Sequence, residues 1–262
     1  GSHFIPLALT TTYKGVMEAL ITNTLTDEDV VFISRNSKLE KIIHPYTKNI
    51  YYIDELKSDV KPSLIILEAV EPSGSLTNLE KISKCMRLKY PGTLIAADLS
   101  QVFSIDHIVL EDVDVDAFIV LPERGLMGIP GVSFLIVNKK FSTYVKEKRR
   151  DLFFVPYAFD LIKYENAWSK KHTTPYSPDI SATIALSKSI EFIEGNGEIT
   201  EHIQRHKIIA DIIRSEMIKM GFNIVGDSVD SSNSFSRFKI PKDFEKNQIC
   251  SQLIKKNILI SG

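Results

Sequence analysis

Short apolar runs that alternate with helical patterns fill the first half of the chain and constrain its fold more than any other feature. A strand buried on both faces is continuously apolar, whereas a strand with one wet face alternates apolar and polar residues. Helical segments between the runs favour parallel pairing, because a parallel connection must cross over the sheet. The sequence therefore predicts an α/β fold with a three-layer, mostly parallel sheet. The predicted strands are Ile5–Thr10, Val30–Ser34, Ile50–Ile53, Ser63–Leu67, Leu94–Ala97, Ala117–Leu121 and Val132–Val137, with helices at Val16–Thr24 and Asn78–Tyr90.

The second half of the chain has a different pattern. A polar stretch rich in aromatic residues, Lys146–Pro178, shows no clear period. We expect a large α/β domain at residues 4–198 and a small α+β domain at residues 199–262, joined near Gly195 and Gly197. The elements predicted in this half are helices at Ser181–Glu194, Thr200–Met220 and Phe244–Lys256, and strands at Phe222–Val225, Phe235–Ile240 and Ile258–Ile260.

Composition limits the classes of function. The 262 residues are 44% hydrophobic and 25% charged, the balance of a soluble globular protein. With 32 basic and 33 acidic residues and no basic block, nothing favours a nucleic-acid or membrane surface, so we expect a small-molecule or protein partner. No apolar run approaches the roughly 20 residues that span a bilayer. The opening Gly1–His3 resembles a cloning remnant.

Cysteines and histidines form no recognisable disulfide or metal pattern. Cys85 and Cys250 are far apart, so we expect two small buried side chains in a reducing, cytoplasmic environment. His202 and His206 could lie on one helix face, but no third ligand accompanies them, and we expect a solvated face and no metal. Three aspartates alternate with valines and lack the glycine of a calcium loop, so we assign them to a strand entrance: Asp112, Asp114 and Asp116.

Candidate ligand-binding residues follow the predicted strands, since ligands of open α/β sheets bind beyond the carboxyl ends of the strands. The first strand leads through Thr12 and Lys14 into a helix, whose free N–H groups favour an anion; the alternative is that a threonine caps the helix. Glu71 stands in a turn after the strand Ser63–Leu67. Asp98 follows a hydrophobic strand and needs a cationic or hydrogen-bonding partner there, although it could also cap the next helix.

A glycine-spaced hairpin, Pro122–Gly131, follows the strand Ala117–Leu121 and carries Glu123 and Arg124. It completes a series of segments that resembles the class V aminotransferases, which include the alanine–glyoxylate and serine–pyruvate enzymes. The resemblance runs from about residue 5 to residue 262 and implies the fold of the pyridoxal-phosphate-dependent transferases. It rests on Thr10–Leu20, Glu71–Gly74, Ala97–Ser100, Leu126–Val132 and Thr174–Pro178, in the family's order.

The resemblance implies pyridoxal phosphate as cofactor and a homodimer. Asp98 falls where the family's aspartate pairs with the pyridinium nitrogen. Tyr176 and Ser177 resemble residues that reach toward the cofactor phosphate, usually from the neighbouring subunit. In the phosphate-binding turn Thr12 is the retained hydroxyl, whereas bulky Tyr13 stands at a glycine position and Lys14 at a threonine position.

Arg124 falls at the family's Schiff-base lysine. A guanidinium stays protonated, so it cannot attack an aldehyde as an amine does. Lys139 and Lys140 lie beyond the next strand, and Ser34–Leu39 lacks the family's stacking aromatic ring. Two hypotheses follow: a degenerate binding or regulatory homologue without lysine-based transamination, or an active enzyme moving an amino group between a small amino acid and a 2-oxo acid. For the first, we expect Arg124 to pair with a carboxylate such as Asp98, Glu71 or Glu123.

Overall fold

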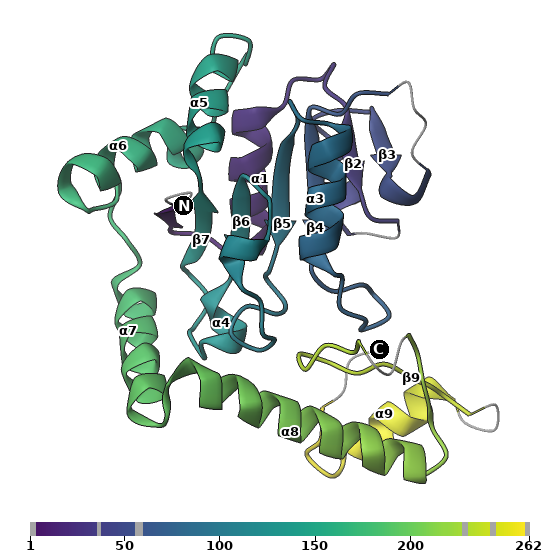
Figure 1. Ribbon diagram of the computed structural model, residues 1–262. Coiled ribbons are helices and arrows are strands. Elements are labelled where there is room, and N and C mark those ends of the chain that lie inside the picture. Colours follow the sequence, from purple (N-terminus) through teal and green to yellow (C-terminus); the bar gives the residue numbers. More distant parts are fainter. Residues whose placement is uncertain (1–3, 36–37, 56–59, 227–229, 242–244, 260–262) are drawn as a thin grey trace.

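A seven-stranded sheet forms the centre of the computed structural model, which describes residues 4–35, 38–55, 60–226, 230–241 and 245–259 (Figure 1). Its strand order is β1-β7-β6-β5-β4-β2-β3. Strand β7 is antiparallel to both neighbours and the other pairs are parallel, so the predicted mostly parallel α/β sheet is confirmed. The strands are β1 (Ile5–Leu9), β2 (Val31–Ile33), β3 (Ile50–Tyr52), β4 (Leu64–Glu68), β5 (Leu94–Asp98), β6 (Ala117–Val120) and β7 (Ser133–Val137).

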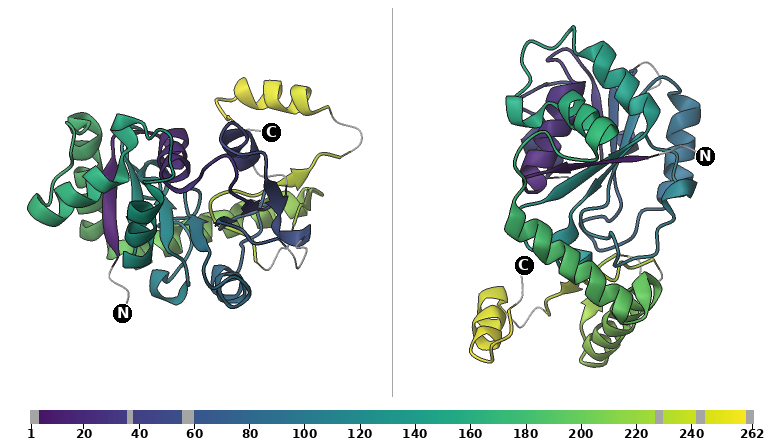
Figure 2. Two further views of the ribbon diagram at one scale, coloured as in Figure 1. Left: turned by 90° about the horizontal axis from the view of Figure 1, so that it is seen from above. Right: turned by 90° about the vertical axis from the view of Figure 1, so that its left-hand side faces the viewer.

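Helices cover both faces of the sheet, which gives the three layers seen edge-on in Figure 2. Successive side chains of a strand point to opposite faces. In β4, Leu64 and Ile66 therefore join the apolar core beneath α1, whereas Ile65 and Leu67 join the core beneath α3. The apolar runs of these strands are continuous because both faces of the sheet are buried. The helices of this part are α1 (Tyr13–Thr24), α2 (Leu39–Ile43), α3 (Leu79–Lys89), α4 (Pro122–Gly125), α5 (Lys139–Lys148), α6 (Leu161–Lys171) and α7 (Ile180–Gly195), with the 3-10 turns η1 (Ile53–Glu55), η2 (Leu110–Asp112) and η3 (Tyr157–Phe159).

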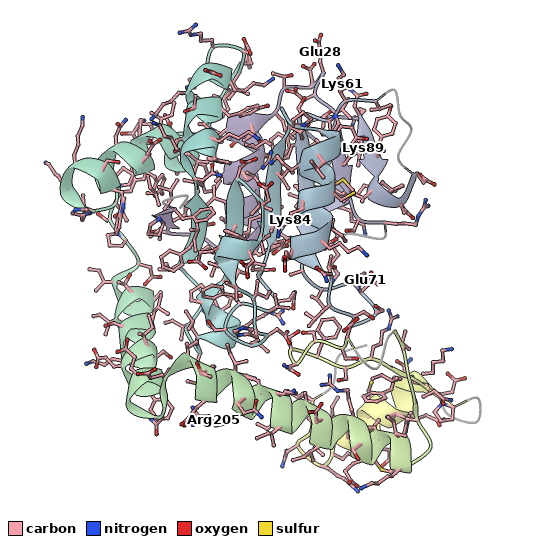
Figure 3. All side chains as sticks on the ribbon, viewed as in Figure 1. Glu28, Lys61, Glu71, Lys84, Lys89 and Arg205 are labelled. Carbon is pink, nitrogen blue, oxygen red and sulfur yellow. The ribbon has the colours of Figure 1, made fainter. Side chains whose placement is uncertain are left out.

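The carboxyl ends of all strands except β7 meet at one edge of the sheet. In Figure 3, Glu28 and Lys61, which precede β2 and β4, lie at the top, whereas Glu71, which follows β4, lies toward the lower end of the sheet. The lower edge, which we call the carboxyl rim, therefore holds the residues that follow β4, β5 and β6. The opposite edge is the amino rim.

One prediction for the connecting segments was wrong and one is confirmed. The stretch Lys146–Pro178 has a regular element after all, since it contains helix α6, which buries Leu161 and Tyr164 against the core. The segment Pro122–Gly131 connects the antiparallel strands β6 and β7 as the predicted hairpin, and it begins with the short helix α4.

The last part of the chain lies below the carboxyl rim (Figure 1). It contains α8 (Glu198–Lys219), the strand pair β8 (Asn223–Ile224) and β9 (Phe238–Lys239), and α9 (Lys246–Ile254). Ile258 and Leu259 form no strand, contrary to the prediction, and Ile260 lies outside the described residues, as do Phe244 and Gly1–His3. None of the helices described combines the length and apolar character that crossing a bilayer requires.

The amino rim is held by a buried ionic cluster. Asp116 is 1% exposed and accepts hydrogen bonds from Arg87 at 2.8 Å, from Lys140 at 3.3 Å and from the backbone N–H of Ile95 at 2.9 Å. Asp114 contacts the same arginine from its exposed side. The assignment of these aspartates to a strand entrance is therefore confirmed. Lys140 is bound to Asp116 at the amino rim, the edge of the sheet opposite Asp98.

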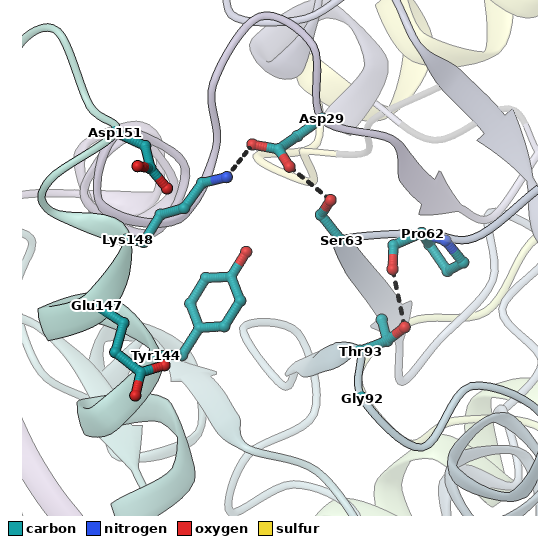
Figure 4. A pocket seen from close by; sticks show the side chains of 9 residues that line it. All are labelled: Asp29, Pro62, Ser63, Gly92, Thr93, Tyr144, Glu147, Lys148 and Asp151. Atoms are coloured by element: carbon teal, nitrogen blue, oxygen red, sulfur yellow. Dashed lines mark hydrogen bonds and ion pairs between the residues drawn. The ribbon is translucent and has the colours of Figure 1, made fainter.

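A cavity of about 390 Å³ also opens at the amino rim, where nine lining residues are drawn in Figure 4. Asp29 is one of the lining residues. It pairs with Lys148 at 2.7 Å and accepts a hydrogen bond from Ser63 at 2.5 Å. The pKa of Asp29 is lowered because these bonds outweigh its partial burial. Asp98 does not line this cavity, because it lies at the carboxyl rim, the opposite edge of the sheet.

Candidate functional site at the carboxyl rim

Asp98 ends the central strand β5 and points toward α1. The side chains of Leu94, Ala96 and Asp98 share one face by strand alternation, and the first two lie in the core beneath α1. Glu68, at the end of β4, is its register partner on the neighbouring strand. Two carboxyl groups therefore stand side by side at the rim, on the face where α1 begins.

The carboxyl group of Asp98 accepts from two neutral donors, one at each oxygen. The phenol of Tyr13 donates to Oδ2 at 2.7 Å, and the backbone N–H of Ser100 donates to Oδ1 at 2.9 Å. Asp98 is only 7% exposed. Burial raises its pKa, an effect that the bonds from Ser100 and Tyr13 partly offset. The expectation that Asp98 needs a hydrogen-bonding partner is confirmed, and the partner is Tyr13.

Tyr13 is the residue of this cluster whose contact the sequence did not reveal. Its pKa is raised strongly, first by burial and then by the charge and hydrogen bond of Asp98 and the charge of Glu68. The phenol therefore keeps its proton and donates a hydrogen bond beside two acids. The one signal in the sequence was its bulk at a position where the resembling turn has glycine.

The start of α1 is tightly fixed. Thr12 is the N-cap residue of α1 and has extended backbone, but its side chain makes no capping hydrogen bond. The alternative that a threonine caps the helix is therefore correct for the position of the cap and wrong for the side-chain bond. The hydroxyl of Ser133 donates to the carbonyl of Thr11 at 2.8 Å. A Cβ on Gly15 would lie 1.8 Å from Thr11 Oγ1, so no side chain fits there. Thr12 and Lys14 are exposed on this turn.

Arg124 does not approach Asp98 as expected. Its side chain is exposed on α4, and within the described ranges it takes part in no ion pair or side-chain hydrogen bond. The predicted pairing with a carboxylate was wrong, because Tyr13 already satisfies Asp98. The neighbouring Glu123 has a buried Oε2 atom that finds no hydrogen-bond partner among the residues described.

The hairpin that carries Arg124 is anchored from three sides. A Cβ on Gly125 would lie 1.9 Å from the carbonyl oxygen of Phe103, so this backbone packs directly on the loop after β5. His202 of α8 contacts the carbonyl of Gly125 through Nε2 at 2.6 Å, and Ser189 of α7 donates to the carbonyl of Met127 at 2.9 Å. Position 124 is therefore held rigidly while its side chain faces outward.

The interpretation of His202 and His206 as a solvated helix face was wrong. His202 is 5% exposed and lies 3.2 Å, Nε2 to Nε2, from His206. The pKa of His206 is lowered by burial and by the neighbouring His202 and Arg205. Within the described part of the chain no group of three or more possible metal ligands occurs. Cys85 is exposed and Cys250 partly exposed, so the expectation that both are buried was also wrong.

Glu71 stands in the turn between β4 and α3 and shares no side-chain hydrogen bond with Asp98 or Tyr13 in the described structure. It is exposed and accepts from Ser73 at 3.2 Å. This turn packs on the last part of the chain, since the backbone N–H of Ser232 donates to the carbonyl of Gly74 at 2.9 Å. Ser232 in turn donates to Asp106, whose pKa is raised by burial. Glu71 thus borders the junction with the C-terminal part.

Tyr176 and Ser177 lie between α6 and α7, outside the cluster around Asp98. The hydroxyl of Tyr176 donates to the carbonyl of Tyr157, and its ring packs on Tyr157 and Tyr164. Ser177 is exposed. Within one chain, the structure brings together Tyr13, Asp98 and Glu68 and leaves the Tyr176 segment apart.

Several solved structures with the same architecture are aminotransferases. An alanine–glyoxylate aminotransferase from Nostoc sp. superposes with a TM-score of 0.87 at 19% identity and covers 98% of this chain and 72% of that chain. A pyridoxamine–pyruvate aminotransferase from Mesorhizobium loti gives a TM-score of 0.86 at 16% identity, covering 98% and 70%. These likenesses establish the fold, which is that of the pyridoxal-phosphate-dependent aminotransferases.

The sequence model of the family described as Aminotransferase class-V matches residues 41–262, and the chain belongs to this family. An uncharacterised aminotransferase of Methanocaldococcus jannaschii is 25% identical over 158 residues, 60% of this chain and 40% of that protein. The small subunit of a soluble hydrogenase of Synechococcus sp. is 25% identical over 233 residues, 80% of this chain and 59% of that protein. The chain thus spans about half the length of these relatives, and the resemblance stated from its motifs is confirmed.

Proposed function

We propose that this chain is a class V aminotransferase homologue that does not perform lysine-based transamination and acts by binding a small molecule or a protein partner. One observation carries the proposal: the carboxylate of Asp98 is engaged by the Tyr13 phenol at 2.7 Å, while Arg124 lies exposed without an ionic partner in the described structure. In the described structure, no ion pair or hydrogen bond therefore joins the acid and the basic residue of this site.

The residues present do not fit pyridoxal phosphate, the cofactor on which class V aminotransferases depend. That cofactor supplies an electron sink and needs a carboxylate at its ring nitrogen and an amine at its aldehyde. Here the carboxylate has a phenol as its partner, and the guanidinium of Arg124 cannot serve as the amine. Lys140 is bonded to Asp116 at the opposite rim. The residues of this site therefore provide no route to transamination.

The test is chemical trapping. The protein is incubated with pyridoxal phosphate, reduced with borohydride and mapped by mass spectrometry, and amino-group transfer to pyruvate and glyoxylate is measured in parallel. We expect no stoichiometric lysine adduct and no transfer above buffer. A single labelled lysine peptide together with transfer that is lost when that lysine becomes alanine would overturn the proposal.

The second candidate is an active pyridoxal-phosphate-dependent aminotransferase acting on a small amino acid. Its support is the buried Asp98 at the end of β5 and the pyridoxamine–pyruvate transaminase from Mesorhizobium japonicum, 23% identical over 162 residues. Arg124→Lys is the discriminating variant, because it supplies the amine at the held position of α4. If this variant forms no lysine adduct and transfers no amino group, the second candidate is refuted.

A homodimer remains a prediction from the family resemblance. Its support is a group of exposed aromatic side chains in the stretch Lys146–Pro178: Phe153, Phe154 and Tyr157. Size-exclusion chromatography with light scattering should give twice the 29.6 kDa chain mass at micromolar concentration. A monomer under these conditions would contradict it.

The division at residues 198 and 199 and a cytoplasmic location also remain predictions. Limited proteolysis tests the division: cleavage near Gly195 and Gly197 should release two stable fragments, and a single resistant core would contradict it.

A further inference from the structure

Tyr13 occupies the position that any external partner of Asp98 would have to take. Its hydroxyl lies 2.7 Å from Oδ2, the carboxylate oxygen that Ser100 leaves available. We infer that Tyr13 is an internal ligand of Asp98, a tyrosine plug, which keeps a planar pyridine-type ring out of the site. This inference rests on the proposed function and goes further, because it names the residue that closes the site.

The turn that carries Tyr13 is held by its neighbours. The hydroxyl of Ser133 on β7 donates to the carbonyl of Thr11 at 2.8 Å, and Thr11 Oγ1 fills the space that a Cβ at Gly15 would need. We therefore expect the plug to open by rotation of the Tyr13 side chain, which breaks the partly buried hydrogen bond to Asp98 Oδ2.

Charge keeps the phenol in its donor form. Asp98 and Glu68 are register partners on β5 and β4, and both raise the pKa of Tyr13 in addition to burial. A neutral phenol satisfies a buried carboxylate without adding a second charge. An incoming cationic ring N–H would need to displace this donor and to be desolvated itself. The plug therefore competes with the ring directly, independently of the residue at position 124.

The experiment separates ring binding from Schiff-base chemistry. The probe is 4′-deoxypyridoxine 5′-phosphate, which carries the ring nitrogen and the phosphate but no aldehyde, so no lysine is needed to hold it. Binding is measured by isothermal titration calorimetry for the unmodified chain and for Tyr13→Gly, Tyr13→Phe and the double variant Tyr13→Gly/Asp98→Asn. Tyr144→Phe is the matched control, because this partly buried phenol donates to the backbone carbonyl of Thr24 at 3.2 Å near the amino rim.

We expect Tyr13→Gly to bind the probe at least about tenfold more tightly than the unmodified chain. Tyr13→Phe should gain little, because the ring bulk stays, and Tyr144→Phe should not change. The double variant should lose the gain, because Asp98 would no longer accept from the ring nitrogen. Circular dichroism checks folding, and Tyr13→Ser replaces Tyr13→Gly with the same expectation if the glycine variant is unfolded.

Equal affinity of the unmodified chain and Tyr13→Gly would overturn the plug, as would a gain that survives Asp98→Asn. Either result leaves the proposed function standing. A trapped lysine adduct in the unmodified chain, in contrast, defeats the proposed function whatever the probe does.

Discussion

Replacing Tyr13 with phenylalanine removes one hydroxyl from the buried pair with Asp98 and leaves the ring in place. The lost bond is 2.7 Å long. A hydrogen bond to a charged group contributes about 1.5–3 kcal/mol to stability, and a bond between neutral groups about 0.5–1.5 kcal/mol. We expect Tyr13→Phe to lower the free energy of unfolding by about the smaller amount where Asp98 is protonated and by about the larger amount where it is ionised.

The pH dependence has a definite sign. Burial raises the pKa of Asp98 in the folded state above its unfolded value of about 3.9. The stability that Asp98 contributes is therefore fully present below about pH 3.9 and is lost as pH rises through the folded pKa. The Tyr13 hydroxyl lowers this folded pKa, so its removal extends the loss to higher pH. The cost of Tyr13→Phe must grow as pH rises.

Urea unfolding from about pH 4 to pH 9 measures this cost, with the fluorescence of Trp168, the only tryptophan, as reporter. The same substitution in an Asp98→Asn background should cost about 0.5–1.5 kcal/mol at every pH, because the partner is then neutral. A cost of Tyr13→Phe that is constant with pH and equal in both backgrounds would refute the reasoning.

Three further predictions concern the frame of the site. Asp116→Ala should cost about 1.5–3 kcal/mol because it removes the buried acceptor that Arg87, Lys140 and the Ile95 N–H share, whereas Asp114→Ala, at 46% side-chain exposure, should cost less than about 1 kcal/mol; equal costs in urea unfolding would contradict this. Gly125→Ala should lower stability by about 1–3 kcal/mol, because the new Cβ meets a backbone carbonyl; an unchanged melting temperature would contradict the close approach. Asp106→Ala removes the acceptor of Ser232, so hydrogen exchange should speed up in residues 230–237, and unchanged protection would show that Asp106 does not hold this segment.

The sheet could be predicted because its strands obey a local rule. A run such as Leu64–Leu67 is apolar at every position since both faces are dry, and this pattern needs no knowledge of distant residues. Helix α6 was missed although Leu161, Tyr164 and Trp168 recur at helical spacing, because the run is short and stands within a longer polar stretch without a period.

Side-chain partners at the rim could not be predicted because they depend on three-dimensional register. Tyr13 and Asp98 are 85 residues apart, and their contact requires α1 to begin above the end of β5. His202 was misplaced for another reason. Helix α8 exposes isoleucines such as Ile208, Ile209 and Ile212, so its apolar pattern does not mark the face that meets the hairpin of Gly125.

The pairing of β1 with β7 has a consequence for the order of events during synthesis. Ile5 pairs with Val137, so the first strand finds its partner only after β7 has left the ribosome. At about 5–20 residues per second, this delay is on the order of ten seconds. During that time β2 to β6 can assemble by parallel pairing, while β1 and the turn that carries Tyr13 wait undocked. The hydroxyl that closes the site can therefore reach Asp98 only once β7 is present to dock β1 against the sheet.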